Sequence, residues 1–263
     1  MLIKMDLISV ILPVYNSEKY ISKSIKSILN QTHKNFEFII INDNSTDKSE
    51  KIILKYKDPR IKYIKNKINI GEQKSTNLGL KIAKGKYIAI MHSDDISHNE
   101  RLEKEFNYLN ENKNIFLIGT KFRIINKNNK VVKIPNIKQI KHNQIKKNLI
   151  NGKNQICHPS IMFRNEKKIR YRSKISYCPD LDLYFQLLSK NKKINIIDNI
   201  LIDYRIHENQ ISSSKKYKQY LFKKNTLDIY KGLIKYSEFN PNKILNLNES
   251  MLKNKDKIIY YHL

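Results

Sequence analysis

Three short polar stretches in the first hundred residues carry the side chains best suited to chemistry. They are Tyr15-Asn16, Asn42-Asp43-Asn44-Ser45 and His92-Ser93-Asp94-Asp95. In proteins, Mg²⁺ takes one or two carboxylates and completes its coordination shell with substrate phosphate oxygens. The pair Asp94-Asp95 therefore suits a metal that faces a diphosphate. Asp and Asn also form ordinary turns and helix caps, so a single stretch has little weight alone.

The elements before these stretches predict a common location for them. Apolar, β-branched runs at 8–12, 36–41, 61–64 and 87–91 read as buried strands. Helical spacing of apolar residues separates them at about 21–29, 52–56 and 72–84. Such alternation predicts right-handed crossovers and a mostly parallel sheet. Ligands of open α/β sheets bind past the carboxyl ends of the strands, where all three polar stretches fall.

The second half of the chain has a less regular pattern. We expect a helix around 102–109, strands at 115–125 and 131–134, and a basic helix at 138–150. A further strand is expected to start with 158–163, a helix at 181–188 and a late strand at 201–206. Beyond Ser212 the sequence suggests polar helix of unassigned role.

Two familiar phosphate-binding signatures are missing from the sequence. Neither G-x-G-x-x-G after the first strand nor G-x-x-x-x-G-K-[ST] occurs. A nucleotidyltransferase on a related sheet would normally show a glycine-rich phosphate loop near the first strand, so that alternative is disfavoured. Phosphates bound here must be neutralised in another way, and the acidic pair Asp94-Asp95 suggests a metal for this.

Composition limits the possible partners and surroundings. The 263 residues include 51 Lys+Arg against 24 Asp+Glu, a formal charge of +27. Such a charge attracts nucleic acid, acidic membranes or phosphorylated substrates, but the lysines are scattered and no nucleic-acid-binding motif is present, so we expect no nucleic acid. The two cysteines exclude a disulfide scaffold. With no apolar run of about 18 residues, we expect a cytoplasmic protein, with peripheral membrane contact as an open hypothesis.

Several ordered segments resemble glycosyltransferase family 2, the inverting enzymes of the GT-A fold. In the first half they are ISVILPVYNSEKYISKSIKSILNQT, FEFIIINDNSTDKS and NIGEQKSTNLGLKIAKGKYIAIMHSDDI. Later matches are HPSIMFR at 158–164, PDLDLYFQL at 179–187 and YRIHENQIS at 204–212. Together they cover about four fifths of the chain in the expected order. Each segment alone would be weak, whereas the ordered set is specific.

The resemblance implies a role for each candidate residue. Asp180 matches the catalytic base, and Asp95 the metal ligand for Mg²⁺ or Mn²⁺. Pro13 is among the implied substrate-binding residues. The others are Tyr15 and Asp43 near the base, Asp94 near the ribose, His158 near the acceptor entrance, and Arg205 or His207 near the diphosphate. An inverting transfer needs a carboxylate to take the proton of the attacking hydroxyl, and a metal to offset charge on the leaving diphosphate.

The sequence departs from the family pattern at four positions. His92 stands where many members have Asp, Asn42 replaces the first acid after the second strand, Thr76 replaces a common Arg, and Pro179 replaces the acid before the base. These departures bear on donor preference more than on activity, because Asp43, Asp95 and Asp180 are present.

The sequence therefore predicts a metal-dependent inverting glycosyltransferase of the GT-A fold. We expect a catalytic domain at 1–212, with a nucleotide-sugar half at 1–100 and an acceptor half at 101–212, and a helical extension at 213–263. The expected donor is a UDP-sugar and the expected acceptor a glycan or a lipid-linked glycan. Two alternatives stay open: a catalytically degenerate sugar-binding or scaffold protein of the same fold, and a basic nucleic-acid-binding module.

Overall fold

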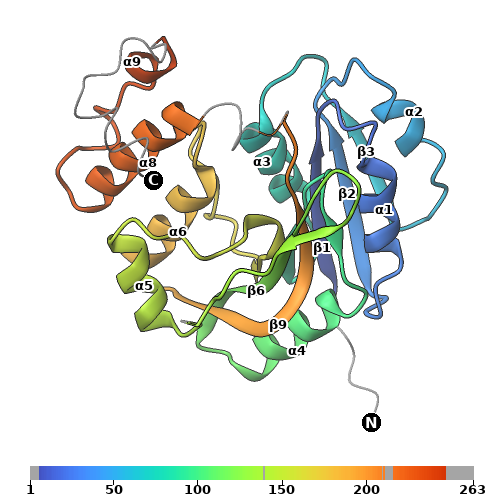
Figure 1. Ribbon diagram of the computed structural model, residues 1–263, viewed down its shortest axis with the longest axis horizontal. Coiled ribbons are helices and arrows are strands. Elements are labelled where there is room, and N and C mark those ends of the chain that lie inside the picture. The colour runs from blue at the N-terminus through green and yellow to red at the C-terminus, as the bar shows by residue number, and fades with distance from the viewer. Residues whose placement is uncertain (1–5, 139, 209, 211–215, 247–263) are drawn as a thin grey trace.

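The computed structural model describes residues 6–138, 140–208, 210 and 216–246. One mixed sheet runs through the molecule, with strand order β3-β2-β1-β4-β8-β6-β9-β5 and β7 paired to β6. Helices cover both of its faces (Figure 1). The described strands are β1 (Ile8–Val14), β2 (Phe36–Asn42), β3 (Ile61–Lys65), β4 (Tyr87–Ile90), β5 (Ile96–Ser97), β6 (Ile115–Ile125), β7 (Val131–Lys133), β8 (Met162–Arg164) and β9 (Lys193–Arg205).

The first half has the parallel architecture that its sequence predicts. β1 pairs in parallel with β2 on one side and β4 on the other, and β2 pairs in parallel with β3. Both faces of β1 and β2 are buried, which explains their uninterrupted apolar sequence. Three helices connect these strands: α1 (Ile21–Leu29), α2 (Ser49–Ile53) and α3 (Glu72–Ile82).

Two glycines position α3 against the sheet, Gly79 at the contact with β1 and Gly71 at the helix start. A Cβ atom at Gly79 would come within 2.6 Å of the Ile11 side chain, so a glycine is needed at this helix–strand contact. Gly71, with a φ of 88°, lies just before the helix in a conformation that favours glycine. As a result, Glu72 in the first turn of α3 is held at the edge where β1, β2 and β4 end.

The second half mixes strand directions. β8 runs antiparallel to both β4 and β6, whereas the long β9 pairs in parallel with β6 and antiparallel with β5. Its helices are α4 (Arg101–Glu111), α5 (His142–Ile150), α6 (Pro179–Ser189), α8 (Lys216–Tyr230) and α9 (Asn242–Leu245). Among the described residues, none of the helices combines the length and apolar character needed to cross a bilayer.

Two expected strand limits in this half were wrong. Residues 158–160 form a 3-10 turn, and the strand begins only at Met162. The reason is Pro159, which lacks a backbone donor, together with the bond from Ser160 N to the Cys157 carbonyl. The late strand begins at Lys193 instead of Leu201, because β9 shifts its register against β6 and so accommodates the polar residues at 198–199.

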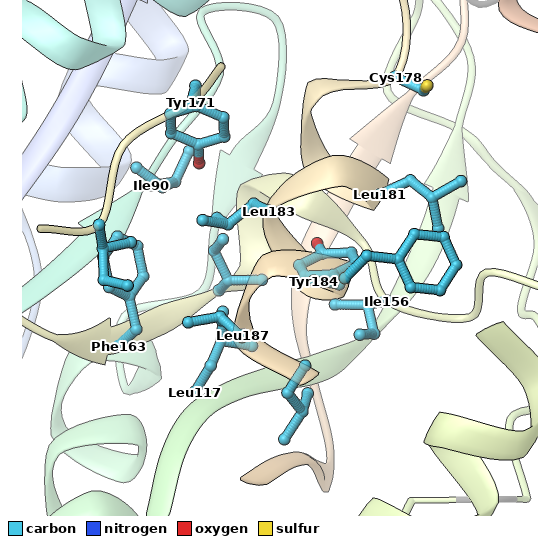
Figure 2. Packing of buried hydrophobic residues seen from close by; sticks show 14 of the residues in the cluster. Ile90, Leu117, Ile156, Phe163, Tyr171, Cys178, Leu181, Leu183, Tyr184 and Leu187 are labelled. Atoms are coloured by element: carbon cyan, nitrogen blue, oxygen red, sulfur yellow. The ribbon is translucent and has the colours of Figure 1, made fainter. Parts of the chain in front are cut away.

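A hydrophobic core on each face of the sheet holds the helices in place. On one face, α1, α2 and α4 pack on the sheet, while α3, α5 and α6 pack on the other and α8 packs against α6. In the second core, Leu183, Tyr184 and Leu187 of α6 point toward Leu117 and its neighbours on the sheet (Figure 2). α6 is therefore anchored along its length, and its first turn stands at a fixed place beside the sheet edge.

The expected C-terminal helical extension is described only in part. α8 and α9 lie within it, whereas 213–215 and 247–263 fall outside the described residues. α8 packs on the start of α6: Phe222 is fully buried and its ring contacts Tyr177, and Thr226 Oγ1 lies 3.4 Å from Cys178 Sγ. The extension thus buttresses the helix that carries Asp180.

Candidate active site

A large cleft opens at the carboxyl ends of β1, β2 and β4. Its volume is about 1460 Å³, above the roughly 300–1,000 Å³ of typical small-molecule pockets, so it has room for two substrates. Seven of the candidate residues line it: Pro13, Tyr15, Asp43, Asp94, His158, Asp180 and His207. The topology therefore brings together residues that are up to 194 positions apart in the sequence, counting from Pro13 to His207.

The turn after β2 forms the most tightly bonded wall of the cleft. Asp43 is 2% exposed. One of its oxygens accepts hydrogen bonds from Asn66 Nδ2 (2.7 Å) and Ile70 N (2.9 Å), and the other accepts one from Gly71 N (2.8 Å). Asn44 takes a φ of 58°, a region that Asn tolerates better than most residues. Asp43 therefore ties the loop before α3 to the end of β2.

The first polar turn, after β1, is linked to the second. Asn16 N donates to Ser45 Oγ (3.1 Å), and Asn16 Oδ1 accepts from Thr46 N (2.8 Å). Tyr15 stays 50% exposed over the cleft. An exposed aromatic ring beside a bonded loop offers a face on which a planar group can stack.

The acidic turn after β4 is held from behind by Arg205. The backbone N of Arg205 donates to Asp95 Oδ1 (2.7 Å), and its Nε donates to the Asp94 carbonyl (2.7 Å). Both Arg205 and Asp95 are buried, and neither is among the described residues that line the cleft. Arg205 Nη2 finds no hydrogen-bond partner among the described residues. Its main visible contribution is to position the acidic turn.

The two carboxylates of this turn have opposite electrostatic settings. Burial would raise the pKa of Asp94, but the hydrogen bond from His207 Nε2 (3.0 Å) and the nearby His92 lower it overall. Burial and the negative charge of Asp94 raise the pKa of Asp95 well above its usual range. Within the described part of the chain, Asp95 Oδ2 has no hydrogen-bond partner. A buried carboxylate oxygen without a donor is costly unless a cation satisfies it.

This acidic turn fits a divalent metal. Asp94, Asp95 and His92 each offer a ligand atom, and the three atoms lie within 4.8 Å of one another. The distance between Asp95 Oδ2 and His92 Nδ1 is 3.8 Å. This Oδ2 is the oxygen that has no hydrogen-bond partner within the described part of the chain. Carboxylate oxygens suit Mg²⁺ and Mn²⁺, so the residues present match the expected group.

Asp180 lies across the cleft, in the first turn of α6. It follows Pro179 at the helix start, where Pro is well tolerated. Asn154 Nδ2 donates to Asp180 Oδ2 at 3.0 Å. Burial, and then the negative charge of Glu72, raise the pKa of Asp180. A carboxylate with a raised pKa accepts a proton more readily, as a general base must.

Three further residues, two that line the cleft and one behind it, escaped the sequence-based assignment of roles. Glu72 starts α3, and His92 was noted only as a departure from the family pattern. Tyr171 is buried, and its hydroxyl lies 2.7 Å from His158 Nε2. His158 Nδ1 in turn lies 2.9 Å from His92 Nε2. Burial, together with His92, lowers the pKa of His158 well below its usual value. The sequence could have suggested Glu72, because it lies in the first turn of a predicted helix. No sequence pattern predicted the position of Tyr171.

The cysteines take no visible part in this chemistry. Cys157 and Cys178 are both buried free thiols. Burial raises the pKa of each thiol well above its usual range, which disfavours the nucleophilic thiolate.

Comparisons with known proteins point to one family. The family model described as Glycosyl transferase family 2 matches residues 9–172. An uncharacterized glycosyltransferase of Methanocaldococcus jannaschii is 39% identical over 224 residues, which cover 82% of this chain and 77% of that protein. The UDP-Glc:alpha-D-GlcNAc-diphosphoundecaprenol beta-1,3-glucosyltransferase WfgD of Escherichia coli is 33% identical over 80% of this chain and 81% of its own.

A solved structure shares the fold. TarS of S. aureus, crystallised in complex with UDP-GlcNAc, matches with a TM-score of 0.72 at 20% sequence identity, over 97% of this chain and 78% of that chain. At this identity the likeness concerns the fold, and it agrees with the mixed sheet and flanking helices described above.

Proposed function

The chain belongs to glycosyl transferase family 2 and is a glycosyltransferase, and from this premise we propose that its cleft transfers a sugar from a UDP-sugar to a hydroxyl group with inversion. One observation carries the proposal: Asp43, Asp94 and Asp180 line a single cleft although they come from three separate elements. WfgD is named for a UDP-Glc donor, and TarS was crystallised with UDP-GlcNAc, which supports UDP as the nucleotide.

The donor occupies the side of the cleft formed by the first half of the chain. Tyr15 offers its exposed ring to the nucleotide base, beside Pro13 and the bonded turn of Asp43. The diphosphate then lies toward Asp94 and His207, which line the same cleft. Of the two late basic residues, His207 lines the cleft and is the better placed to approach the diphosphate, whereas Arg205 acts from beneath through the acidic turn.

Asp94, Asp95 and His92 are the residues that would hold the divalent metal, Mg²⁺ or Mn²⁺. When bound, such a metal offsets the negative charge that develops on the leaving diphosphate. Arg205 keeps the turn in place by two hydrogen bonds to it, so the carboxylates need little rearrangement on binding. Positioning of this kind lowers the cost of organising charge during the reaction.

Asp180 is the proposed general base. It takes the proton of the acceptor hydroxyl as the oxygen of that hydroxyl forms a bond to the anomeric carbon. The bond from the anomeric carbon to the diphosphate breaks at the same time, and the nucleoside diphosphate leaves with the electron pair. Attack opposite to the leaving group inverts the anomeric configuration. The raised pKa of Asp180 suits this proton transfer, and Asn154 orients the carboxylate.

The acceptor is proposed to be a glycan, either free or linked to a lipid. WfgD is named for a diphosphoundecaprenol-linked acceptor. The cleft extends beyond the donor side to His158 and Tyr177, where an acceptor sugar fits near Asp180. For a lipid-linked acceptor, the exposed lysines of the basic segment before and within α5, such as Lys141 and Lys147, would meet anionic headgroups. Vesicle sedimentation tests this contact, and equal binding to neutral and anionic vesicles would contradict it.

Thermal shift with a panel of nucleoside diphosphates, with and without Mn²⁺, tests the donor site. A ligand that binds only the native state raises its apparent stability. We expect a Mn²⁺-dependent shift with UDP that is lost in Asp95→Ala. If no nucleotide of the panel produced a thermal shift, the result would contradict the proposed donor site. It would favour a protein of this family without transfer activity. A shift with another nucleotide would replace UDP and keep the rest.

A further inference from the structure

Two histidines and a glutamate converge in the cleft wall beside the acidic turn, and His92 belongs to both groups. Glu72 comes from the first turn of α3, His92 from the end of β4 and His158 from the 3-10 turn before β8. One ligand atom of each lies within 4.8 Å of the others. His92 Nε2 lies 2.9 Å from His158 Nδ1 and 3.4 Å from Glu72 Oε1. All three residues line the cleft.

An oxygen atom holds the remaining nitrogen of the His158 ring, and another oxygen faces that of His92 without bonding to it. His158 Nε2 lies 2.7 Å from the hydroxyl of Tyr171, and His92 Nδ1 faces Asp95 Oδ2 at 3.8 Å. Tyr171 is itself fixed, because it is buried and its backbone N donates to Asn77 Oδ1 at 2.9 Å; Figure 2 shows its ring beside Ile90 of β4. In metal centres, a ligating histidine is usually oriented as His158 is here, with its second nitrogen bonded to an oxygen.

We infer that Glu72, His92 and His158 form a binding site for a transition-metal dication of the Zn²⁺ class, separate from the carboxylates of Asp94 and Asp95. Two imidazoles with one carboxylate favour Zn²⁺ and its neighbours over Mg²⁺ or Ca²⁺, which prefer oxygen ligands. Three protein ligands leave one tetrahedral position free for water or a substrate hydroxyl. That position faces the cleft because the three residues line it.

A plain hydrogen bond between the two rings accounts for less of the geometry. It would satisfy one N–H of the histidine pair, but it assigns no role to Glu72, whose carboxylate approaches the same nitrogen of His92. A cation between the three atoms uses all of them. His92 also links the two sites, since its Nε2 faces this cluster and its Nδ1 faces Asp95.

Metal binding to the full chain, without nucleotide, tests the inference. After removal of metals by chelation, Zn²⁺ is titrated in competition with a chromophoric chelator, and Co²⁺ is added separately to record its visible spectrum. We expect one tight Zn²⁺ equivalent and a Co²⁺ spectrum typical of tetrahedral coordination. Glu72→Gln and His158→Gln should each weaken Zn²⁺ binding by about 100-fold or more, since loss even of an outer partner costs about 10–100-fold.

Two further variants keep the result interpretable. Asp94→Asn alters the other site and should leave Zn²⁺ binding within a few fold of the parent. Tyr171→Phe keeps the ring and removes only the hydroxyl that holds His158, so it should weaken Zn²⁺ binding about 10-fold even if the ligand variants fold poorly.

The inference is overturned if the parent protein binds no Zn²⁺, if Tyr171→Phe and His158→Gln bind it as the parent does, or if only Asp94→Asn loses it. Because nucleotide is left out, these outcomes are independent of the Mn²⁺-dependent UDP shift that tests the proposed transfer.

Discussion

The turn after β2 and the turn after β4 lie at the same edge of the sheet, yet their carboxylates are bonded in contrasting ways. Both oxygens of Asp43 accept hydrogen bonds from Asn66, Ile70 and Gly71. Asp95 is just as buried, but its Oδ2 lacks a donor within the described part of the chain. Asp43 therefore shapes the cleft through protein contacts to both of its oxygens, whereas Asp95 retains an oxygen for a ligand.

This difference separates what the fold needs from what the reaction needs. A carboxylate whose bonds are all made contributes to stability, and its loss leaves buried donors without partners. A buried carboxylate with a missing bond costs stability in the absence of its ligand, so its presence points to function. The variants below are ordered from the largest expected effect to the smallest, and each tests one side of this comparison.

Asp180 extends the comparison to the opposite wall, where its carboxylate accepts a hydrogen bond from the Asn154 side chain. In Asp180→Asn we expect turnover to fall by about 10²–10⁴, the usual contribution of a general base. The amide has nearly the same shape and is no harder to bury, so folding should persist. Steady-state kinetics with a UDP-sugar and a glycan acceptor measure the effect.

Asp198→Asn provides the matched control, because Asp198 is exposed on β9, where it pairs with Lys121. Its turnover should stay close to that of the parent. The raised pKa of Asp180 also places the acidic limb of the rate profile above the ordinary aspartate value of about 3.9. Turnover that survives in Asp180→Asn would assign the base to another residue.

Asp95→Asn tests the unsatisfied side directly. The amide keeps an oxygen for the bond from Arg205 N and removes the buried charge. We therefore expect no loss of unfolding free energy in metal-free buffer. Mn²⁺-dependent stabilisation should disappear, about 2.7 kcal/mol when the ligand is present at 100 times its Kd. Denaturant unfolding with and without Mn²⁺ measures both quantities. A large loss of unfolding free energy in metal-free buffer would mean that Asp95, like Asp43, stabilises the fold.

The same comparison shows how far sequence alone could reach. Strand ends in β1, β2 and β4 were predictable because apolar runs stop at polar turns, and parallel pairing then had to bring those turns together. The family, the fold and the transferase activity were also predicted and are confirmed by the comparisons. The assigned roles of Asp43, Asp95 and Asp180 stay predictions.

Other features depend on contacts that no local pattern encodes. The burial of Arg205 behind the acidic turn requires β9 to run beside β6. Arg205 and Asp95 are more than 100 residues apart in the sequence. The pairing of His92 with His158 likewise requires the 3-10 turn that Pro159 helps to form. Sequence spacing carries no information on which of these buried atoms finds a partner.

Asp43→Ala tests the satisfied side. The change removes an acceptor from two backbone donors and one side-chain donor, all close to Gly71 at the start of α3. Each buried donor left without a partner costs about 1–3 kcal/mol, and water entering from the cleft relieves part of this. We expect unfolding free energy to fall by about 2 kcal/mol with or without Mn²⁺. A loss confined to the Mn²⁺-containing sample would mean that Asp43 binds the metal.

Asn66→Ala gives the smallest and most specific effect on the comparison. Asn66 is buried, and its Nδ2 donates to Asp43 Oδ1 at 2.7 Å and to Ser75 Oγ at 2.9 Å. Its removal leaves Asp43 with two backbone donors, so we expect a loss of about 1 kcal/mol, the typical net value of a hydrogen bond. Lys67→Ala, one position along and exposed, should have no measurable effect.

Because the Asp43 carboxylate stays bound to Ile70 N and Gly71 N, UDP affinity should change little in Asn66→Ala. An Asn66→Ala protein of parent stability that no longer binds UDP would instead make this turn a direct donor contact, and the division between the two turns would fail.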